Sequence, residues 1–155
     1  MNSFEPHITV ATLVEDAGRF LLVREQKNGK LVLNQPAGHV EANESLVQAA
    51  FRETLEESAW QVEITDYLGL YIYQPRLGRG VFYRHCFVAK PLKHDPGLKL
   101  DTGIVEALWL TADEIAARSD EHRSPLLQQC LDDYLSGRRL PLDTIYQHPW
   151  PLQRG

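Results

Sequence analysis

The chain has 155 residues, 43% of them hydrophobic and 24% charged, which indicates one globular domain spanning residues 1–155. Its 16 lysines and arginines against 21 aspartates and glutamates give a net charge of −5, which argues against nucleic acid or an anionic membrane as a partner. The two cysteines, Cys86 and Cys130, are too few and too far apart for a disulfide scaffold or a C-x-x-C metal site.

The N-terminal quarter is predicted to form three short strands joined by tight turns. Residues 7–14 are apolar and β-branched, as in a buried strand. Residues 16–18 form a turn into a strand at 19–24, and Asn28-Gly29 marks a second turn before a strand at 30–33.

Residues 43–58 have the period of a helix. Ser45 and Gln48 have the spacing of a capping box, which places the helix start there or one residue earlier. The spacing i, i+3, i+4, i+7, i+8 predicts one apolar stripe facing the core. This stripe consists of Val47, Ala50, Phe51, Thr54 and Leu55.

The C-terminal half alternates strands with two helices. Strands are predicted at about 62–73, 81–89 and 104–110, with a loop at 76–80, and helices at about 112–118 and 125–136. Strands divided among helices without regular βα alternation predict an α/β fold with a mixed sheet between helical layers.

Three carboxylates cluster on the helix at 43–58. At about 100° per residue, Glu53, Glu56 and Glu57 lie within one third of the circumference, on the side away from the predicted apolar stripe, and Arg52 lies beside Glu56. Such a group suits a hard divalent cation, and Mg²⁺ in particular binds few carboxylates and keeps water and phosphate oxygens. An isolated E-x-x-E-E pattern is also compatible with a solvated acidic face.

The longer spacing decides between these two interpretations. Gly38, five residues, Glu44, seven residues, Arg52-Glu53, two residues and Glu56-Glu57 resemble the Nudix box, the signature of the Nudix hydrolases, here at residues 38–60. The resemblance implies a Nudix α/β/α sandwich and Mg²⁺-dependent hydrolysis of pyrophosphate bonds, with Mn²⁺ as a possible substitute.

Two positions depart from the family pattern. Ala59 occupies a position where the family usually has glycine, and Thr54 occupies a position that is usually apolar. The first concerns how the helix ends, because alanine resists the left-handed conformation that glycine permits. The second concerns core packing, and neither removes a candidate ligand.

Segments outside the box resemble the NudJ-like subgroup of the family. They are residues 6–11, 34–39 and 123–126, and the C-terminal stretch from Gly137 to Pro151. This resemblance implies action on nucleoside di- and triphosphates and on the pyrophosphate of the hydroxymethylpyrimidine precursor of thiamine, with release of orthophosphate.

The resemblance also implies roles for the box residues. Glu53, Glu56 and Glu57 would hold the metal, and Glu53 occupies the position of a metal ligand or general base. The backbone carbonyl of Ala37 or Gly38 would complete the metal site. Arg52 would orient the carboxylates instead of taking part in the chemistry.

The family often uses a further carboxylate from outside the box. Glu106 is the first candidate for this catalytic role, with an exposed loop acid as the alternative interpretation, and Asp101 is the second candidate.

Candidate substrate contacts rest on weaker patterns. Arg76 and Arg79 lie in a loop with glycines and could bind phosphate, although solvated arginines are common in such loops. His39 follows Gly38 and could contact substrate or bond a backbone carbonyl. Aromatic residues in the strands could stack on a base or belong to the core. They are Tyr71, Tyr73, Phe82 and Tyr83.

The sequence therefore predicts a cytoplasmic phosphohydrolase, monomeric or homodimeric, whose partner is a small nucleotide or pyrophosphate substrate. No stretch reaches the roughly 18 apolar residues that span a bilayer, and the first five residues lack the character of a secretory signal. The alternative is a non-catalytic Nudix domain that binds a nucleotide-type metabolite. Such domains commonly lose a glutamate or the arginine of the box, and this chain has kept them.

Overall fold

The structure is a computed structural model that describes residues 4–77 and 80–149. Its strands are β1 (Pro6–Asp16), β2 (Arg19–Lys27), β3 (Lys30–Asn34), β4 (Ala37–His39), β5 (Trp60–Tyr73), β6 (Val81–His94) and β7 (Ile104–Thr111). Its helices are α1 (Leu46–Ser58), α2 (Ala112–Ala117) and α3 (Leu126–Leu135), with single 3₁₀ turns at Ser119–Glu121 and Leu142–Thr144. Within the described ranges, no helix is long and apolar enough to span a membrane.

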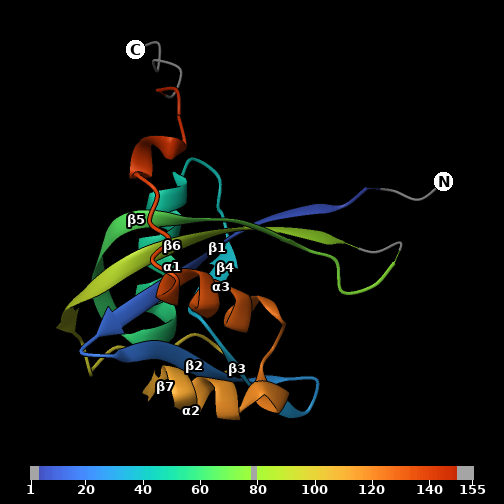
Figure 1. The fold of residues 1–155 in the computed structure, drawn as a ribbon, viewed down its shortest axis with the longest axis vertical. Coiled ribbons are helices and arrows are strands. Elements are labelled where there is room, and N and C mark those ends of the chain that lie inside the picture. Colours follow the sequence, from blue (N-terminus) through green and yellow to red (C-terminus); the bar gives the residue numbers. More distant parts are fainter. Residues whose placement is uncertain (1–3, 78–79, 150–155) are drawn as a thin grey trace.

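The strands form a mixed sheet, as predicted. β1 lies at its centre, parallel to β6 and antiparallel to the short β4. The end of β1 turns into β2, which pairs with β3 and β7, while β5 pairs with β6 at the other side. Figure 1 shows β5, β6 and β1 as one long twisted ribbon, with β2, β3 and β7 below it.

Both predicted tight turns are confirmed. Ala17 and Gly18 join β1 to β2 with φ of 49° and 80°, and Asn28 and Gly29 join β2 to β3 with φ of 50° and 77°. Two successive positive φ values match the right-handed twist of the flanking strands, which explains why Asn-Gly predicted a turn here.

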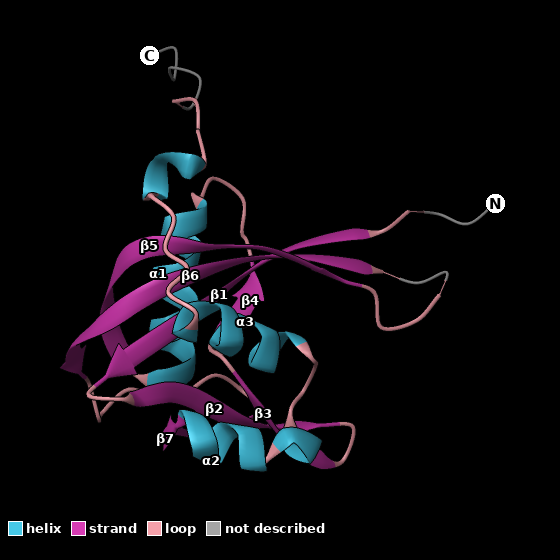
Figure 2. Ribbon diagram, in the orientation of Figure 1, coloured by secondary structure: helices cyan, strands magenta, loops and turns pink. Residues whose placement is uncertain are grey.

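Helices cover both faces of the sheet, which confirms the α/β/α sandwich (Figure 2). On one face, Ala49 and Ala50 of α1 pack against Val10 and Phe87. On the other face, α2 and α3 contribute to a second cluster with residues of β1, β2, β3 and β7. This cluster consists of Leu13, Phe20, Leu22, Leu33, Leu110, Ile115, Leu127 and Leu131.

The predicted apolar stripe of α1 is wrong in part. Ala50 and Thr54 are buried, but Val47 and Phe51 are each 37% exposed. The buried face instead runs through Ala49, Ala50 and Thr54 to Glu57 and Ser58. Small side chains let the helix approach the sheet closely, and the Thr54 hydroxyl is 2.8 Å from that of Thr12 on β1. This rotation of the helix brings Glu57 toward the sheet instead of into solvent.

Candidate active site

The site begins with the two ends of α1. Ser45 accepts a hydrogen bond from the Gln48 amide at 3.0 Å, and the Gln48 side chain accepts one from the Ser45 amide at 2.8 Å, so the predicted capping box is confirmed. The helix ends at Ala59, which adopts the left-handed conformation with φ 62°. Alanine therefore takes the conformation in which glycine was expected, and its amide bonds the Leu55 carbonyl at 2.9 Å.

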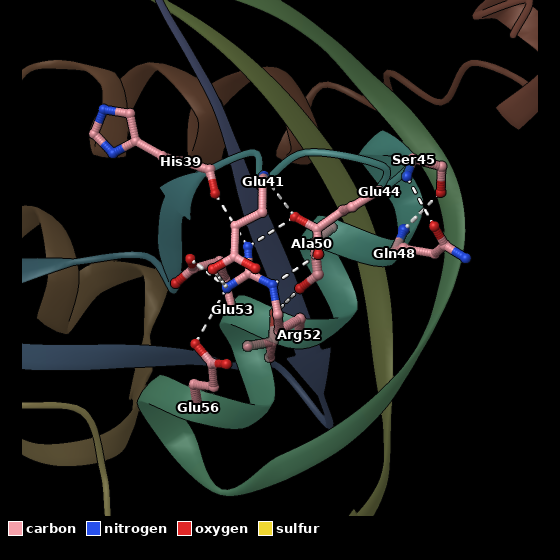
Figure 3. Close-up of polar contacts among 10 residues, drawn as sticks. His39, Glu41, Glu44, Ser45, Gln48, Ala50, Arg52, Glu53 and Glu56 are labelled. Atoms are coloured by element: carbon pink, nitrogen blue, oxygen red, sulfur yellow. Dashed lines mark hydrogen bonds and ion pairs between the residues drawn. The ribbon is translucent and has the colours of Figure 1, made fainter. Parts of the chain in front are cut away.

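Arg52 organises the carboxylates around it (Figure 3). Its guanidinium donates to Glu44 at 2.7 Å, to Glu53 at 2.8 Å and to Glu56 at 3.2 Å, and also to the carbonyl of His39 at 3.1 Å. The bonds to Glu44 are the largest cause of a raised Arg52 pKa and a lowered Glu44 pKa. The donors of one guanidinium thus fix three carboxylates of the box relative to β4.

Glu53 and Glu56 meet a third carboxylate, from Asp101. One oxygen from each of the three side chains lies within 4.8 Å of the others. The Asp101 amide donates to the Glu56 carbonyl at 3.0 Å, which ties the segment before β7 to α1. Asp101, the second candidate from the sequence, is therefore the carboxylate that lies beside Glu53 and Glu56. Glu106, the first candidate, instead pairs with Arg24 at 2.8 Å.

Glu57 lies deeper than the other box glutamates. Its side chain accepts a hydrogen bond from the Ala37 amide at 2.7 Å, and the residue is only 8% exposed. Burial raises the pKa of Glu57 to about 8 in spite of this bond, and burial also raises the pKa of Glu53 against the effect of Arg52. Both carboxyl groups therefore keep a proton more readily than a solvated glutamate does, and ionising them is unfavourable unless a cation balances the charge.

Gly38 lies where β4 meets the carboxylates. A Cβ atom on Gly38 would stand 2.1 Å from the carboxyl carbon of Glu53, so a side chain here would displace the Glu53 carboxylate. The glycine of the box is needed for this close approach. The proposed role of the Ala37 or Gly38 carbonyl as a metal ligand remains a prediction.

A pocket of about 800 Å³ opens beside these groups. Glu41, Glu53 and Glu57 line one part of it, and cationic, polar and aromatic side chains line the rest. The latter include Thr9, Lys27, Lys30, Asn34, His39, Tyr73, Phe82, Arg84, Arg123 and Ser124.

The predicted substrate contacts are only partly brought to this pocket. His39 lines it and its ring nitrogen is 3.2 Å from that of His7. Arg76 is exposed in the loop between β5 and β6, and Arg79 lies outside the described residues.

Only two of the four aromatic candidates line the pocket. Tyr73 and Phe82 line the pocket, whereas Tyr71 is buried and donates to Asp133 at 2.7 Å. Tyr83 contacts Phe4 edge to face.

Arg84, Thr9 and Asn34 are pocket residues that the sequence analysis missed. The available signal was Arg84 itself, a guanidinium in the middle of a largely apolar strand. A charged residue at such a position needs a partner or a cavity.

The donor set fits a hard divalent cation. Oxygens bound to one such ion at 2.0–2.6 Å lie at most about 5 Å apart, and the three carboxylates of Glu53, Glu56 and Asp101 meet this spacing. Oxygen ligands without histidine or cysteine favour Mg²⁺, Mn²⁺ or Ca²⁺ over softer ions.

The chain is similar to proteins of one known family. Residues 5–130 match the NUDIX domain family. The phosphatase NudJ of Escherichia coli strain K12 is 38% identical over 152 residues, covering 98% of each chain. The solved structure of a NUDIX hydrolase from Nitrosomonas europaea is 40% identical, with a TM-score of 0.89 over 93% of this chain and 98% of the other. The chain therefore belongs to the Nudix hydrolases, enzymes that cleave pyrophosphate bonds.

Proposed function

We propose that this Nudix hydrolase is a Mg²⁺-dependent phosphohydrolase that acts on nucleoside di- and triphosphates and on hydroxymethylpyrimidine pyrophosphate, releasing orthophosphate. The observation that supports it best is the convergence of Glu53, Glu56 and Asp101 beside a pocket with a cationic far wall. The similarity to the phosphatase NudJ supports the substrate class.

Glu53, Glu56 and Asp101 would hold the metal, with Glu57 supplying a further oxygen on the pocket side. When bound, the cation would neutralise phosphate oxygens and make a water molecule easier to deprotonate. Arg52 keeps Glu53 and Glu56 in place, so that their repulsion does not drive them apart.

The chemical step needs an acceptor for one proton. A water oxygen attacks phosphorus, the bond from that phosphorus to the bridging oxygen breaks, and the departing phosphate keeps the electron pair. Glu53 lines the pocket, and its carboxylate oxygen that does not hold the metal would be suited to take the proton of the attacking water.

A substrate panel tests this proposal. Nucleoside di- and triphosphates and hydroxymethylpyrimidine pyrophosphate are each incubated with Mg²⁺, with Mn²⁺ or with EDTA, and orthophosphate and pyrophosphate are assayed separately. We expect orthophosphate release that requires the metal. Glu53→Gln should reduce turnover by about 100-fold or more, as is usual for loss of a catalytic base.

Glu63→Gln is the matched control, because Glu63 is exposed on β5 and pairs with Lys90 at 3.0 Å. It should keep full activity. Nucleotide binding by calorimetry without any turnover would contradict the proposal and favour a non-catalytic binding domain.

A further inference from the structure

The pocket wall away from α1 holds buried polar atoms with unused hydrogen-bonding capacity. Thr9 is 5% exposed and Asn34 is 2% exposed, and both line the pocket. Within the described part of the chain, neither Thr9 Oγ1 nor Asn34 Oδ1 has a hydrogen-bond partner. Buried polar atoms are paired in the great majority of cases, so two unpaired ones in one pocket indicate a place for a ligand.

Arg84 lies on the same wall. It is the partner of Thr9 in the parallel pairing of β1 and β6, so the two side chains stand next to each other on one face of the sheet. The half-buried guanidinium donates to Gln35 at a long 3.4 Å.

Arg84 lacks an ion-pair partner in the part of the chain that the structure describes, and Glu25 acts on its charge only from a longer distance. Among the described residues, no carboxylate lies within 4.0 Å of its guanidinium. Arg123 lines the same pocket, but its guanidinium is paired with the Glu25 carboxylate at 2.7 Å, as is usual for a partly buried arginine. Burial lowers the pKa of Arg84, as expected for a cation without a counter-ion.

An anion in the pocket would satisfy the Arg84 guanidinium and the Thr9 hydroxyl together. The guanidinium fork matches the geometry of phosphate oxygens. The Thr9 hydroxyl is able to donate to the same anion, whereas Asn34 Oδ1 only accepts hydrogen bonds and does not bind an anion in the orientation that the structure shows. β1 separates β4 from β6, so Arg84 lies roughly 10 Å from the strand that abuts Glu53.

We infer that Arg84 and Thr9 bind a phosphate group of the substrate other than the one attacked at the carboxylates of α1. This inference rests on the proposed function for the identity of the substrate. It makes Arg84 a determinant of substrate affinity and favours substrates whose phosphate chain extends across the pocket.

A thermal-shift titration tests the anion site without metal or turnover. The probe is inorganic pyrophosphate at millimolar concentration in EDTA, with wild type, Arg84→Met and Arg19→Met. Arg19 is exposed at the start of β2 and serves as the control. We expect pyrophosphate to raise the Tm of wild type and of Arg19→Met but not of Arg84→Met.

The Tm without ligand separates binding from a structural role. Because an unbalanced buried cation destabilises the fold, Arg84→Met should have a Tm equal to or above that of wild type. Thr9→Val, which removes an unpaired hydroxyl while keeping the shape, should behave in the same way. Either a lower Tm for Arg84→Met without ligand or an unchanged response of this variant to pyrophosphate would overturn the inference.

Kinetics with a nucleoside triphosphate and Mg²⁺ give an independent result. Arg84→Met should raise KM by about tenfold or more, as expected for loss of a charged hydrogen bond, with a smaller change in kcat, and Arg84→Lys should recover part of the affinity. An unchanged KM in an active enzyme would overturn this inference but not the proposed function. If wild type cleaves no phosphoanhydride, the proposed function fails, and the pyrophosphate titration still decides whether Arg84 binds anions.

Discussion

Glu57 links the stability of the protein to its metal chemistry. Its carboxyl pKa is raised from 4.5 to about 8 by burial, so the folded protein holds a proton there that the unfolded chain has already lost. The free energy of unfolding should therefore fall as pH rises from about 4.5 to about 8. Above about pH 8 the protein should show the whole loss of stability caused by the ionised Glu57.

The size of the effect follows from the same shift. At about 1.4 kcal/mol per pKa unit, ionised Glu57 costs the metal-free protein up to about 5 kcal/mol. Glu57→Gln removes the charge, and its amide oxygen can still accept the bond from the Ala37 amide. We expect the variant to be more stable than wild type at pH 8 by roughly 2 kcal/mol or more, which is a Tm higher by roughly 4 °C or more.

Denaturant unfolding in EDTA at several pH values measures this directly. Wild type should lose stability toward pH 8, Glu57→Gln should show a much flatter profile, and the exposed control Glu63→Gln should follow wild type. Saturating Mg²⁺ should stabilise wild type more than Glu57→Gln, because the cation offsets the buried charge. A Glu57→Gln protein that is less stable than wild type at pH 8 in EDTA would refute this reasoning.

Substitutions at three further places test the contacts and the end of α1. Gly38→Ala should lower kcat by about tenfold or more in a phosphate-release assay, with little change in Tm, because the new Cβ displaces the movable carboxylate of Glu53. Full activity would contradict the close approach of Glu53 to Gly38. Thr54→Val leaves the Thr12 hydroxyl unpaired and should lower the free energy of unfolding, measured with denaturant, by about 1–2 kcal/mol. Adding Thr12→Val should recover part of this loss. Strictly additive effects of the two substitutions would argue against the hydrogen bond between the two hydroxyls. Ala59→Val places a β-branched residue at φ 62° and should lower the free energy of unfolding by about 2 kcal/mol or more. Ala59→Gly should change that free energy by less than about 1 kcal/mol. Equal effects of the two substitutions would contradict the left-handed conformation at the end of α1.

The parts of the fold that the sequence predicted depend on local chemistry. The Asn28-Gly29 turn, the capping box at Ser45 and the box glutamates on one helix follow from residues a few positions apart. β4 was not predicted, since its three residues carry no period of their own and it exists only through pairing with β1.

The rest of the site depends on contacts between distant segments. Asp101 joins Glu53 and Glu56 because the chain before β7 returns to α1, and no spacing rule indicates that return. The rotation of α1 that buries Glu57 and exposes Phe51 depends on the surface the sheet offers to it. Arg84 comes beside Thr9 only through the parallel pairing of β1 with β6.

The most direct test of the central claim is anomalous diffraction from crystals grown with Mn²⁺. The account predicts an anomalous peak bound by carboxylate oxygens of Glu53, Glu56 and Asp101, next to Glu57. Crystals with Mn²⁺ bound elsewhere, or with these three carboxylates surrounded only by solvent, would contradict it.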